Sequence, residues 1–264
     1  MPFEELKQKQ SAVWGSGPYE RISEHLAIAH EHLLGEVDAG PGDRWLDVAT
    51  GTGEIAVPAA EGGAEVTGLD LAPAMIATAR ERAAGAGVEL ALEVGDAERL
   101  PYPDASFDVV TSAFGVMFCP DQDAAAAELA RVTRPGGTLA LLNWHPTRGV
   151  AEFFAVMRPY MPPPPEGAGN PFAWGDRDRL AELLGGAFEL EIEEGDCPQP
   201  GSSAEEVWDL FTSSYGPTKA LAGSLDEERR AALRGDWIAY FERFGNGGGV
   251  SQPRPYLLVL GRRR

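Results

Sequence analysis

Short apolar segments alternate with longer segments of helical spacing through the first half of the chain. Runs rich in Val, Leu and Ile occur at residues 44–50, 64–71, 88–95, 107–114 and 138–144. Residues 73–84 and 121–133, which lie between such runs, have helical spacing or helix-forming composition. Strands that alternate with helices form βαβ units around a parallel sheet. The pattern predicts an α/β fold with a doubly wound, mostly parallel sheet.

Two proline signals set boundaries within this pattern. Pro73 suits the first turn of a helix, where its missing N–H would have no partner. The Pro-Gly-Gly tripeptide at 135–137 predicts the end of the helix that precedes the fifth strand.

The alternation fades after Trp144. A proline-rich loop spans residues 161–171, and runs at 187–196 and 254–261 have the pattern of two more strands, giving seven in total. The roughly 50 residues between these last two strands have helical patterns. We expect residues 203–244 to form a helical cap inserted before the last strand.

Sequence signals inside this cap support helices. Ser203 with Glu206, and Ser224 with Glu227, each match the S-x-x-E capping box. One helical stripe of large apolar residues follows: Leu233, Trp237, Tyr240, Phe241 and Phe244.

The overall charge argues against a nucleic-acid partner. The chain has 41 acidic and 22 basic residues, for a formal charge of −19. Such a field repels phosphate backbones unless a basic patch overrides it, and the arginines at 262–264 have the character of a solvated tail.

Other sequence features indicate a cytoplasmic protein without a membrane span or a metal site. Cys119 and Cys197 form no CxxC pair, the N-terminus has no apolar signal region, and no apolar run reaches 18 residues. Three histidines, His25, His30 and His32, fall on the first predicted helix, where the last two cannot share a face.

Three carboxylates are placed at the ends of successive strands. Asp47 lies in the first strand just before the turn that contains Gly51 and Gly53, while Asp70 and Asp96 end the second and third. Ligands of open parallel sheets bind at such carboxyl ends. Glycine lets the backbone approach a ligand, and a carboxylate accepts hydrogen bonds from ribose hydroxyls or an exocyclic amine. The pattern predicts a site for a nucleoside-containing cofactor.

Two other interpretations share some of these residues. Gly51, Gly53 and Ala56 fit G-x-G-x-x-A, with Asp70 near the spacing of an NAD-selecting acid, so an NAD-dependent oxidoreductase is one alternative. NAD binding does not account for Asp47 or Asp96. A Y-x-x-x-K match that ends at Lys219 contains Pro217, which prevents a shared helix face. The other alternative is a non-catalytic sensor or partner-binding module.

Four ordered motifs resemble those of a known enzyme family. They read LDVATGTGEIA, VTGLDLAPAMIATAR, GDAERLPYPDASFDVVTSAFGVMF and ELARVTRPGGTLALLNW. Together they are similar to class I S-adenosylmethionine-dependent methyltransferases, above all to the branch that includes ubiquinone/menaquinone-biosynthesis methyltransferases. The resemblance covers about residues 20–145 and implies a Rossmann-like seven-stranded sheet.

This resemblance implies S-adenosyl-L-methionine as cofactor and S-adenosyl-L-homocysteine as product, with a role for each matching residue. Asp70 would bind the ribose, and Asp96 the adenine amine. The residues implied to contact the adenine are Leu71, Met75 and, through its backbone N–H, Ala97. Those implied beside the methionine portion are Asp47, Ala49, Thr50, Gly51, Gly53, Ser112, Ala113 and Phe114. The family often has glycine at position 49, so the backbone approach at Ala49 is expected to be slightly less close.

We expect the methyl acceptor to lie among aromatic residues from three regions: residues 13–19 before the first helix, the segments after the fourth and fifth strands, and the cap. The expected acceptor-binding residues are Trp14, Tyr19, Phe118, Trp144, Trp208, Phe211 and Tyr215. His145 follows the fifth strand and is the candidate acid/base residue, with a solvent-exposed turn histidine as the alternative.

The complete reading is one methyltransferase domain over residues 1–264. Its expected parts are an N-terminal lid and helix (1–40), a cofactor-binding core (41–146), a connecting segment with a strand (147–202), the cap (203–252) and the last strand (253–264). An aromatic site in an acidic protein favours a small, partly apolar acceptor such as a phenol, quinol or secondary metabolite, methylated on oxygen or carbon. The sequence leaves the oligomeric state open.

Overall fold

A seven-stranded sheet forms the centre of the computed structural model, which describes residues 3–264. The strand order is β3-β2-β1-β4-β5-β9-β6, and β9 alone runs antiparallel to its neighbours. The strands are β1 (Arg44–Val48), β2 (Glu65–Asp70), β3 (Ala91–Val94), β4 (Phe107–Ala113), β5 (Thr133–Trp144), β6 (Phe188–Asp196) and β9 (Pro255–Arg263). The predicted seven-stranded, mostly parallel sheet is confirmed.

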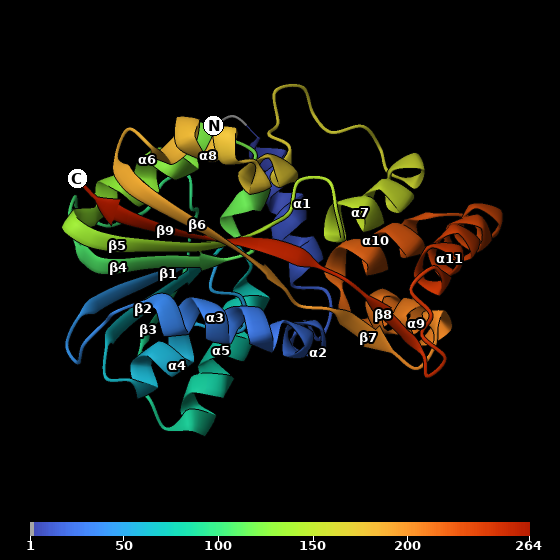
Figure 1. Ribbon diagram of the computed structural model, residues 1–264, viewed down its shortest axis with the longest axis horizontal. Coiled ribbons are helices and arrows are strands. Elements are labelled where there is room, and N and C mark those ends of the chain that lie inside the picture. The colour runs from blue at the N-terminus through green and yellow to red at the C-terminus, as the bar shows by residue number, and fades with distance from the viewer. Residues whose placement is uncertain (1–2) are drawn as a thin grey trace.

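Helices cover both faces of this sheet, as Figure 1 shows, with α3, α4 and α5 on one face and α6 and α8 on the other. Their bounds are α1 (Glu4–Trp14), α2 (Glu20–Ser23), α3 (Ala27–Glu36), α4 (Ala56–Glu61), α5 (Pro73–Ala86), α6 (Gln122–Val132), α7 (Val150–Met157) and α8 (Arg177–Leu184). Short 3₁₀ turns lie at Glu24–Leu26, Val116–Phe118, Arg158–Tyr160 and Pro171–Gly175.

This two-sided cover explains the continuous apolar runs in the sequence. Leu139, Ala140, Leu141 and Leu142 of β5 are all 0% exposed, although their side chains alternate between the two faces. A strand with one solvated face would alternate apolar and polar residues instead.

The order of the sheet reverses between β1 and β4. The chain winds outward from β1 through β2 to β3, and then returns to place β4 on the other side of β1. Asp47 and Thr111 are paired in register across these two strands. Crevices at the carboxyl ends of such neighbours are the usual ligand sites of open α/β sheets.

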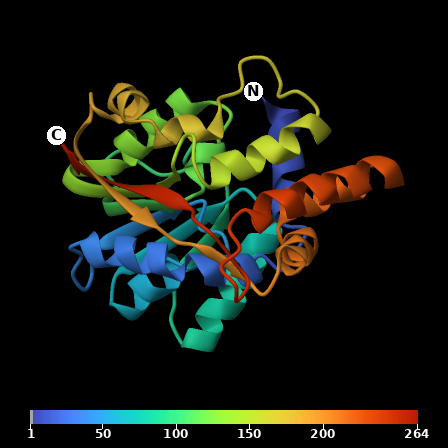
Figure 2. The same cartoon turned by 45° about the vertical axis from the view of Figure 1, so that its right-hand side comes forward.

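The helical cap lies between β6 and β9 in the chain. It consists of α9 (Ala204–Ser214), α10 (Gly216–Ser224) and α11 (Glu227–Glu242). A two-stranded sheet of β7 (Gln199–Gly201) and β8 (Val250–Gln252) connects the cap to the main sheet. Sequence reasoning missed these strands, because three residues are too few to show a period. Figure 2 shows α11 extending away from the sheet, next to α7.

Aromatic packing fixes the cap to the rest of the protein. The predicted stripe is confirmed for Leu233, Trp237, Tyr240 and Phe241, which are buried on α11, whereas Phe244 lies beyond the end of this helix and is partly buried. The Trp237 ring lies with its centroid 4.5 Å from that of Phe153 on α7. The predicted division of the chain into a lid, a core, a connecting segment, a cap and a last strand stays a prediction.

One predicted boundary is wrong. Helix α6 ends at Val132, and β5 begins at once with Thr133, so the Pro-Gly-Gly tripeptide does not end the helix. It lies inside β5, where the register with β4 shifts between the Phe107↔Thr133 and Val109↔Thr138 pairs and Gly136 has a φ of +73°. Extra residues on one strand form a bulge, which glycine accommodates.

The N-terminal expectation also needs correction. Residues 13–19 do not precede the first helix, because α1 covers Glu4–Trp14 and a turn then leads into α2. Helix α1 was not predicted because its polar sequence has no strong apolar stripe. This helix covers the polar residues of the cleft, so it needs few apolar side chains. Residues 1–2 of the expected lid lie outside the described residues. Across residues 3–264, no helix has the length and apolar character needed to span a bilayer.

The first capping box is confirmed and the second is wrong. The Ser203 hydroxyl accepts a hydrogen bond from Glu206 N at the start of α9. Ser224 instead belongs to the last turn of α10, where its hydroxyl donates to Leu221 O. Asp226 caps α11, because its carboxylate accepts from Arg229 N at 2.8 Å.

This assignment predicts different costs for two neighbouring substitutions. Asp226→Ala removes the acceptor for an otherwise unpaired helical N–H and is expected to lower the free energy of unfolding by about 1 kcal/mol. Ser224→Ala, the matched control, is expected to change it by less than about 0.5 kcal/mol. Urea unfolding of both variants measures the difference, and a larger loss for Ser224→Ala would contradict the assignment.

Candidate active site

A cleft opens at the carboxyl ends of β1, β2 and β4, beneath α1. Its cavity volume is about 130 Å³. Five carboxylate side chains line it, those of Asp47, Glu54, Asp70, Asp96 and Glu98. We call this space the acidic cleft.

Asp47 lies near the carboxyl end of β1, at the base of the acidic cleft, and is 1% exposed. Its carboxylate accepts hydrogen bonds from the Thr50 hydroxyl at 2.6 Å and the Thr111 hydroxyl at 2.8 Å. The indole N–H of Trp45 donates to the Thr111 oxygen, so the hydroxyl proton of Thr111 must point to Asp47. Burial raises the pKa of Asp47 to about 7, although the two hydroxyls oppose the shift.

The turn after Asp47 exposes backbone to the cleft. Ala49 has a φ of +55° and Gly51 a φ of +56°, both in the left-handed region. A methyl group built on Gly115 would lie only 2.4 Å from Cβ of Ala49. Alanine is therefore accommodated at position 49 because Gly115, on the facing segment, has no side chain.

Asp70 ties this turn to the end of β2. Its two carboxylate oxygens accept from Gly51 N at 2.9 Å and from Ala72 N at 2.8 Å. The residue is 9% exposed, and burial raises its pKa while these backbone N–H groups oppose the shift. Each oxygen retains a lone pair for a ligand in the cleft.

A buried lysine from α1 reaches the third strand end. Nζ of Lys7 donates to Asp96 at 2.7 Å and also pairs with Glu98. Burial acts to lower the pKa of Lys7, but the two carboxylates outweigh it and the pKa is raised. Two more bonds hold α1 over the cleft, from Gln10 to Phe118 O and from Ser11 to Leu71 O, each 2.9 Å long. Helix α1 therefore covers the cleft.

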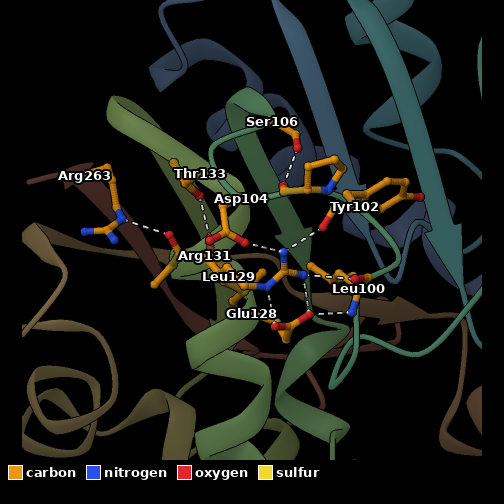
Figure 3. A network of polar contacts seen from close by, with 11 residues as sticks. Leu100, Tyr102, Asp104, Ser106, Glu128, Leu129, Arg131, Thr133 and Arg263 are labelled. Atoms are coloured by element: carbon orange, nitrogen blue, oxygen red, sulfur yellow. Dashed lines mark hydrogen bonds and ion pairs between the residues drawn. The ribbon is translucent and has the colours of Figure 1, made fainter.

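The loop that carries Asp96 and Glu98 is anchored by α6, as Figure 3 shows. The Arg131 guanidinium donates to the carbonyls of Leu100 and Tyr102 and to the carboxylates of Asp104 and Glu128. Glu128 in turn accepts from Leu100 N at 2.7 Å. This network fixes the loop that follows β3 and with it the two acids opposite Lys7.

A second space adjoins the acidic cleft between the sheet and the cap. This aromatic chamber is narrow, with a cavity volume of about 30 Å³, so an aromatic ligand can enter it only if the surrounding rings move apart. Four aromatic side chains line both spaces and separate them, and we call them the neck: Trp14, Tyr19, Phe114 and Phe118. The rings of Trp14 and Phe118 have centroids 5.1 Å apart. Figures 1 and 2 show α1, which carries Trp14, between the sheet and the cap helices.

Phe114 is held in a strained backbone conformation at this neck. Its φ is +56°, which is uncommon for a bulky residue. Its N–H donates to Leu142 O at 2.9 Å, and its ring stacks on Trp144 with centroids 3.8 Å apart. This hydrogen bond and this ring contact therefore hold the Phe114 side chain in one orientation.

The structure brings most of the expected site residues together. Of the expected cofactor-binding residues, those that line the acidic cleft are Asp47, Ala49, Thr50, Gly51, Asp70, Leu71, Met75, Asp96, Ala97, Ala113 and Phe114. Of the expected acceptor-binding residues, those that line the chamber are Trp14, Tyr19, Phe118, Trp144, Phe211 and Tyr215.

Four expected residues lie elsewhere. Gly53 and Ser112 line neither space, but Gly53 shapes the turn with a φ of +88° and the Ser112 hydroxyl accepts from Val116 N. Trp208 packs on Trp237, with centroids 5.5 Å apart, inside the cap. His145 also lines neither space, because Nδ1 accepts from Thr147 N and Arg148 N and Nε2 lies 3.0 Å from Nε of Arg148.

Sequence reasoning missed several residues that line the two spaces. Lys7 lies on a polar helix and His30 on a mostly apolar one, and neither gave a motif. Glu54 accepts from the Ser23 hydroxyl at 2.6 Å and pairs with Arg82 at 3.0 Å. Its position directly after the glycine turn is the sequence feature from which Glu54 could have been predicted to line the cleft. Arg254 stands beside the last strand and was not distinguished from other basic residues.

Comparison with known proteins agrees with this geometry. A family model described as a methyltransferase domain matches residues 46–141. An uncharacterized protein of Mycobacterium tuberculosis is 38% identical over 214 residues, which cover 78% of this chain and 76% of that protein. A demethylmenaquinone methyltransferase of Deinococcus radiodurans is 46% identical over 119 residues, 44% of this chain and 49% of that enzyme. The chain belongs to the class I S-adenosylmethionine-dependent methyltransferases.

Solved structures show that the fold of this methyltransferase is shared widely. The YcgJ protein of Bacillus subtilis superposes with a TM-score of 0.61 at 20% identity, covering 90% of this chain and 98% of that one. A geranyl diphosphate methyltransferase in complex with S-adenosylmethionine gives 0.57 at 18% identity, covering 90% and 85%. The family assignment decides against the NAD-dependent and non-catalytic alternatives.

The raised pKa of Asp47 predicts how the stability of the methyltransferase depends on pH. Between about pH 4 and pH 7 the folded protein keeps this proton and the unfolded chain loses it. The contribution of Asp47 to the free energy of unfolding therefore falls by about 1.4 kcal/mol per pH unit in this window. Asp47→Asn lacks this dependence, so its stability relative to the native protein is expected to rise from pH 4 to pH 7. Urea unfolding at several pH values measures this difference, and a constant difference would contradict the assignment.

Proposed function

We propose that this methyltransferase transfers the methyl group of S-adenosylmethionine to an oxygen or carbon atom of a small, partly apolar acceptor in the aromatic chamber. The observation that carries the proposal is the neck shared by the two spaces. A sulfonium at the end of the acidic cleft would present its methyl group through Trp14, Tyr19, Phe114 and Phe118 to an acceptor on the other side.

The proposed cofactor orientation follows the three strand ends. Asp70 accepts hydrogen bonds from the ribose hydroxyls, with Leu71 and Met75 against the adenine. The methionine portion lies along the Asp47 turn, whose backbone approaches the cleft at Gly51. Asp96 accepts from the adenine amine with the lone pairs that Lys7 and Glu98 N leave free.

The charges in the cleft suit this cofactor. Five acidic side chains line it, of which Asp47 is protonated below about pH 7, and Lys7 contributes one positive charge. S-adenosylmethionine carries a sulfonium and an ammonium, so both of its cationic groups meet a negative field. Loss of the methyl group converts the sulfonium to a neutral thioether, which weakens this attraction in the product.

The chemistry needs alignment more than proton transfer. The bond from methyl carbon to sulfur breaks as the bond to the acceptor forms, and the electron pair remains on sulfur. The lid and the aromatic neck position the reactants and exclude water from the displacement. A base is required only where the acceptor atom loses a proton, and His145, which faces its own turn, is given no role here.

The chamber lining supports a flat or apolar acceptor. Phe153, Phe211 and Phe241 line it together with Val150 and Leu26. Related proteins are named for acceptors of this kind, demethylmenaquinone in one case and geranyl diphosphate in another. Oxygen or carbon nucleophiles of phenols, quinols and other secondary metabolites fit these surroundings.

The test of this proposal isolates the contact of Asp70 with the ribose. Asp70→Asn is expected to weaken S-adenosylhomocysteine binding about tenfold or more, because a charge-assisted acceptor becomes a neutral one. Glu61→Gln on the exposed end of α4 is the matched control and is expected to leave the affinity within about twofold.

The ratio of the affinities for adenosine and 2′,3′-dideoxyadenosine separates loss of the ribose contact from damage to the turn. The native protein is expected to bind adenosine more tightly than 2′,3′-dideoxyadenosine, and Asp70→Asn should reduce that preference. Calorimetric titration measures all four affinities. Equal S-adenosylhomocysteine affinity in Asp70→Asn and the native protein would refute the proposed orientation.

A further inference from the structure

The charged groups around the active site are divided by the neck. The acidic cleft carries five carboxylates, whereas the only charged residue among the described residues that line the aromatic chamber is Arg254. The two tyrosines of the chamber, Tyr19 and Tyr215, remain neutral phenols because burial raises the pKa of each. A protein of net charge −19 thus places an isolated cation in its acceptor space.

Arg254 is almost fully buried, with 3% of its surface exposed. Its Nε donates to Cys197 O at 2.8 Å, and its Nη2 donates to His25 O at 2.6 Å and to Pro198 O at 3.5 Å. Its guanidinium carbon lies 5.9 Å from the centroid of the Trp144 ring. These contacts use Nε and Nη2 and so hold the guanidinium in one orientation.

The remaining hydrogen-bonding capacity of Arg254 is unused. Among residues 3–264, Nη1 has no hydrogen-bond partner and no carboxylate lies within 4.0 Å of the guanidinium nitrogens. A buried cation without a directly paired carboxylate is costly. Burial lowers the pKa of Arg254, and the charge of Asp196, which makes no ion pair with it, opposes this shift only in part. Backbone carbonyls offset only part of this cost, since they carry partial charges.

We propose that Arg254 binds an anionic group, a carboxylate, on the methyl acceptor. A guanidinium matches the planar geometry of a carboxylate. Because Arg254 lines the chamber and not the acidic cleft, the carboxylate is an anchoring group rather than the atom that receives the methyl. The substrate class is therefore a flat or apolar acid whose methylated atom lies toward the neck and whose carboxylate lies at Arg254.

This inference rests on the proposed function for its placement of the acceptor, but its test is independent of turnover. The probes are 2-naphthoate and its neutral isostere 2-naphthamide, titrated calorimetrically into the full chain with and without S-adenosylhomocysteine. The native protein is expected to bind naphthoate at least about tenfold more tightly than naphthamide. Arg254→Gln should bring the ratio close to one.

Two further variants separate anchoring from support of the fold. Arg148→Gln removes an exposed arginine that does not line the chamber, and should leave the ratio unchanged. Arg254→Lys keeps the charge but loses the planar fork, and should retain an intermediate preference. A merely structural role for Arg254 would lower the affinity of both probes equally and leave their ratio the same.

The inference is overturned if the native protein binds the two probes equally, a result that needs no variant to fold. It is also overturned if Arg254→Gln keeps the native ratio. Loss of S-adenosylhomocysteine binding would count against the proposed function alone, because the ratio for the two probes is measured in its absence as well.

Discussion

The buried hydrogen bonds that join β1 to β4 through Asp47 are the constraint on which the site depends. Thr111 of β4 donates to one carboxylate oxygen and Thr50 of the turn donates to the other. These bonds fix the turn relative to the point where the sheet order reverses. Asp70 then holds Gly51 N, and Gly115 leaves space for Ala49. One buried carboxyl therefore sets the position of the backbone that faces the acidic cleft.

Closure of the site comes from elements outside the sheet. Helix α1 lies over the cleft through the Lys7 pair with Asp96 and Glu98, and its last residue, Trp14, reaches Tyr215 with ring centroids 5.5 Å apart. Helix α1 therefore contacts the acidic cleft and the cap at once.

The sheet and the strand-end acids were predictable because each depends on local sequence. Apolar runs mark the strands, and Asp47, Asp70 and Asp96 follow from their positions along those runs. The contacts of Lys7 and Arg254 were not predictable in this way. Lys7 meets its partner 89 residues away, and Arg254 contacts His25 O across 229 residues. Such pairings follow from tertiary packing, as does the displacement of His145 toward its own turn.

In the proposed function, the neck holds the transferable methyl group between the two spaces. Nuclear Overhauser measurements on the protein with S-adenosylmethionine carrying a ¹³C-labelled methyl group test it most directly. The account predicts contacts from that methyl group to ring protons of Trp14, Tyr19, Phe114 or Phe118, with a shift caused by the nearby ring currents. A bound methyl group that contacts none of these four rings would contradict the account.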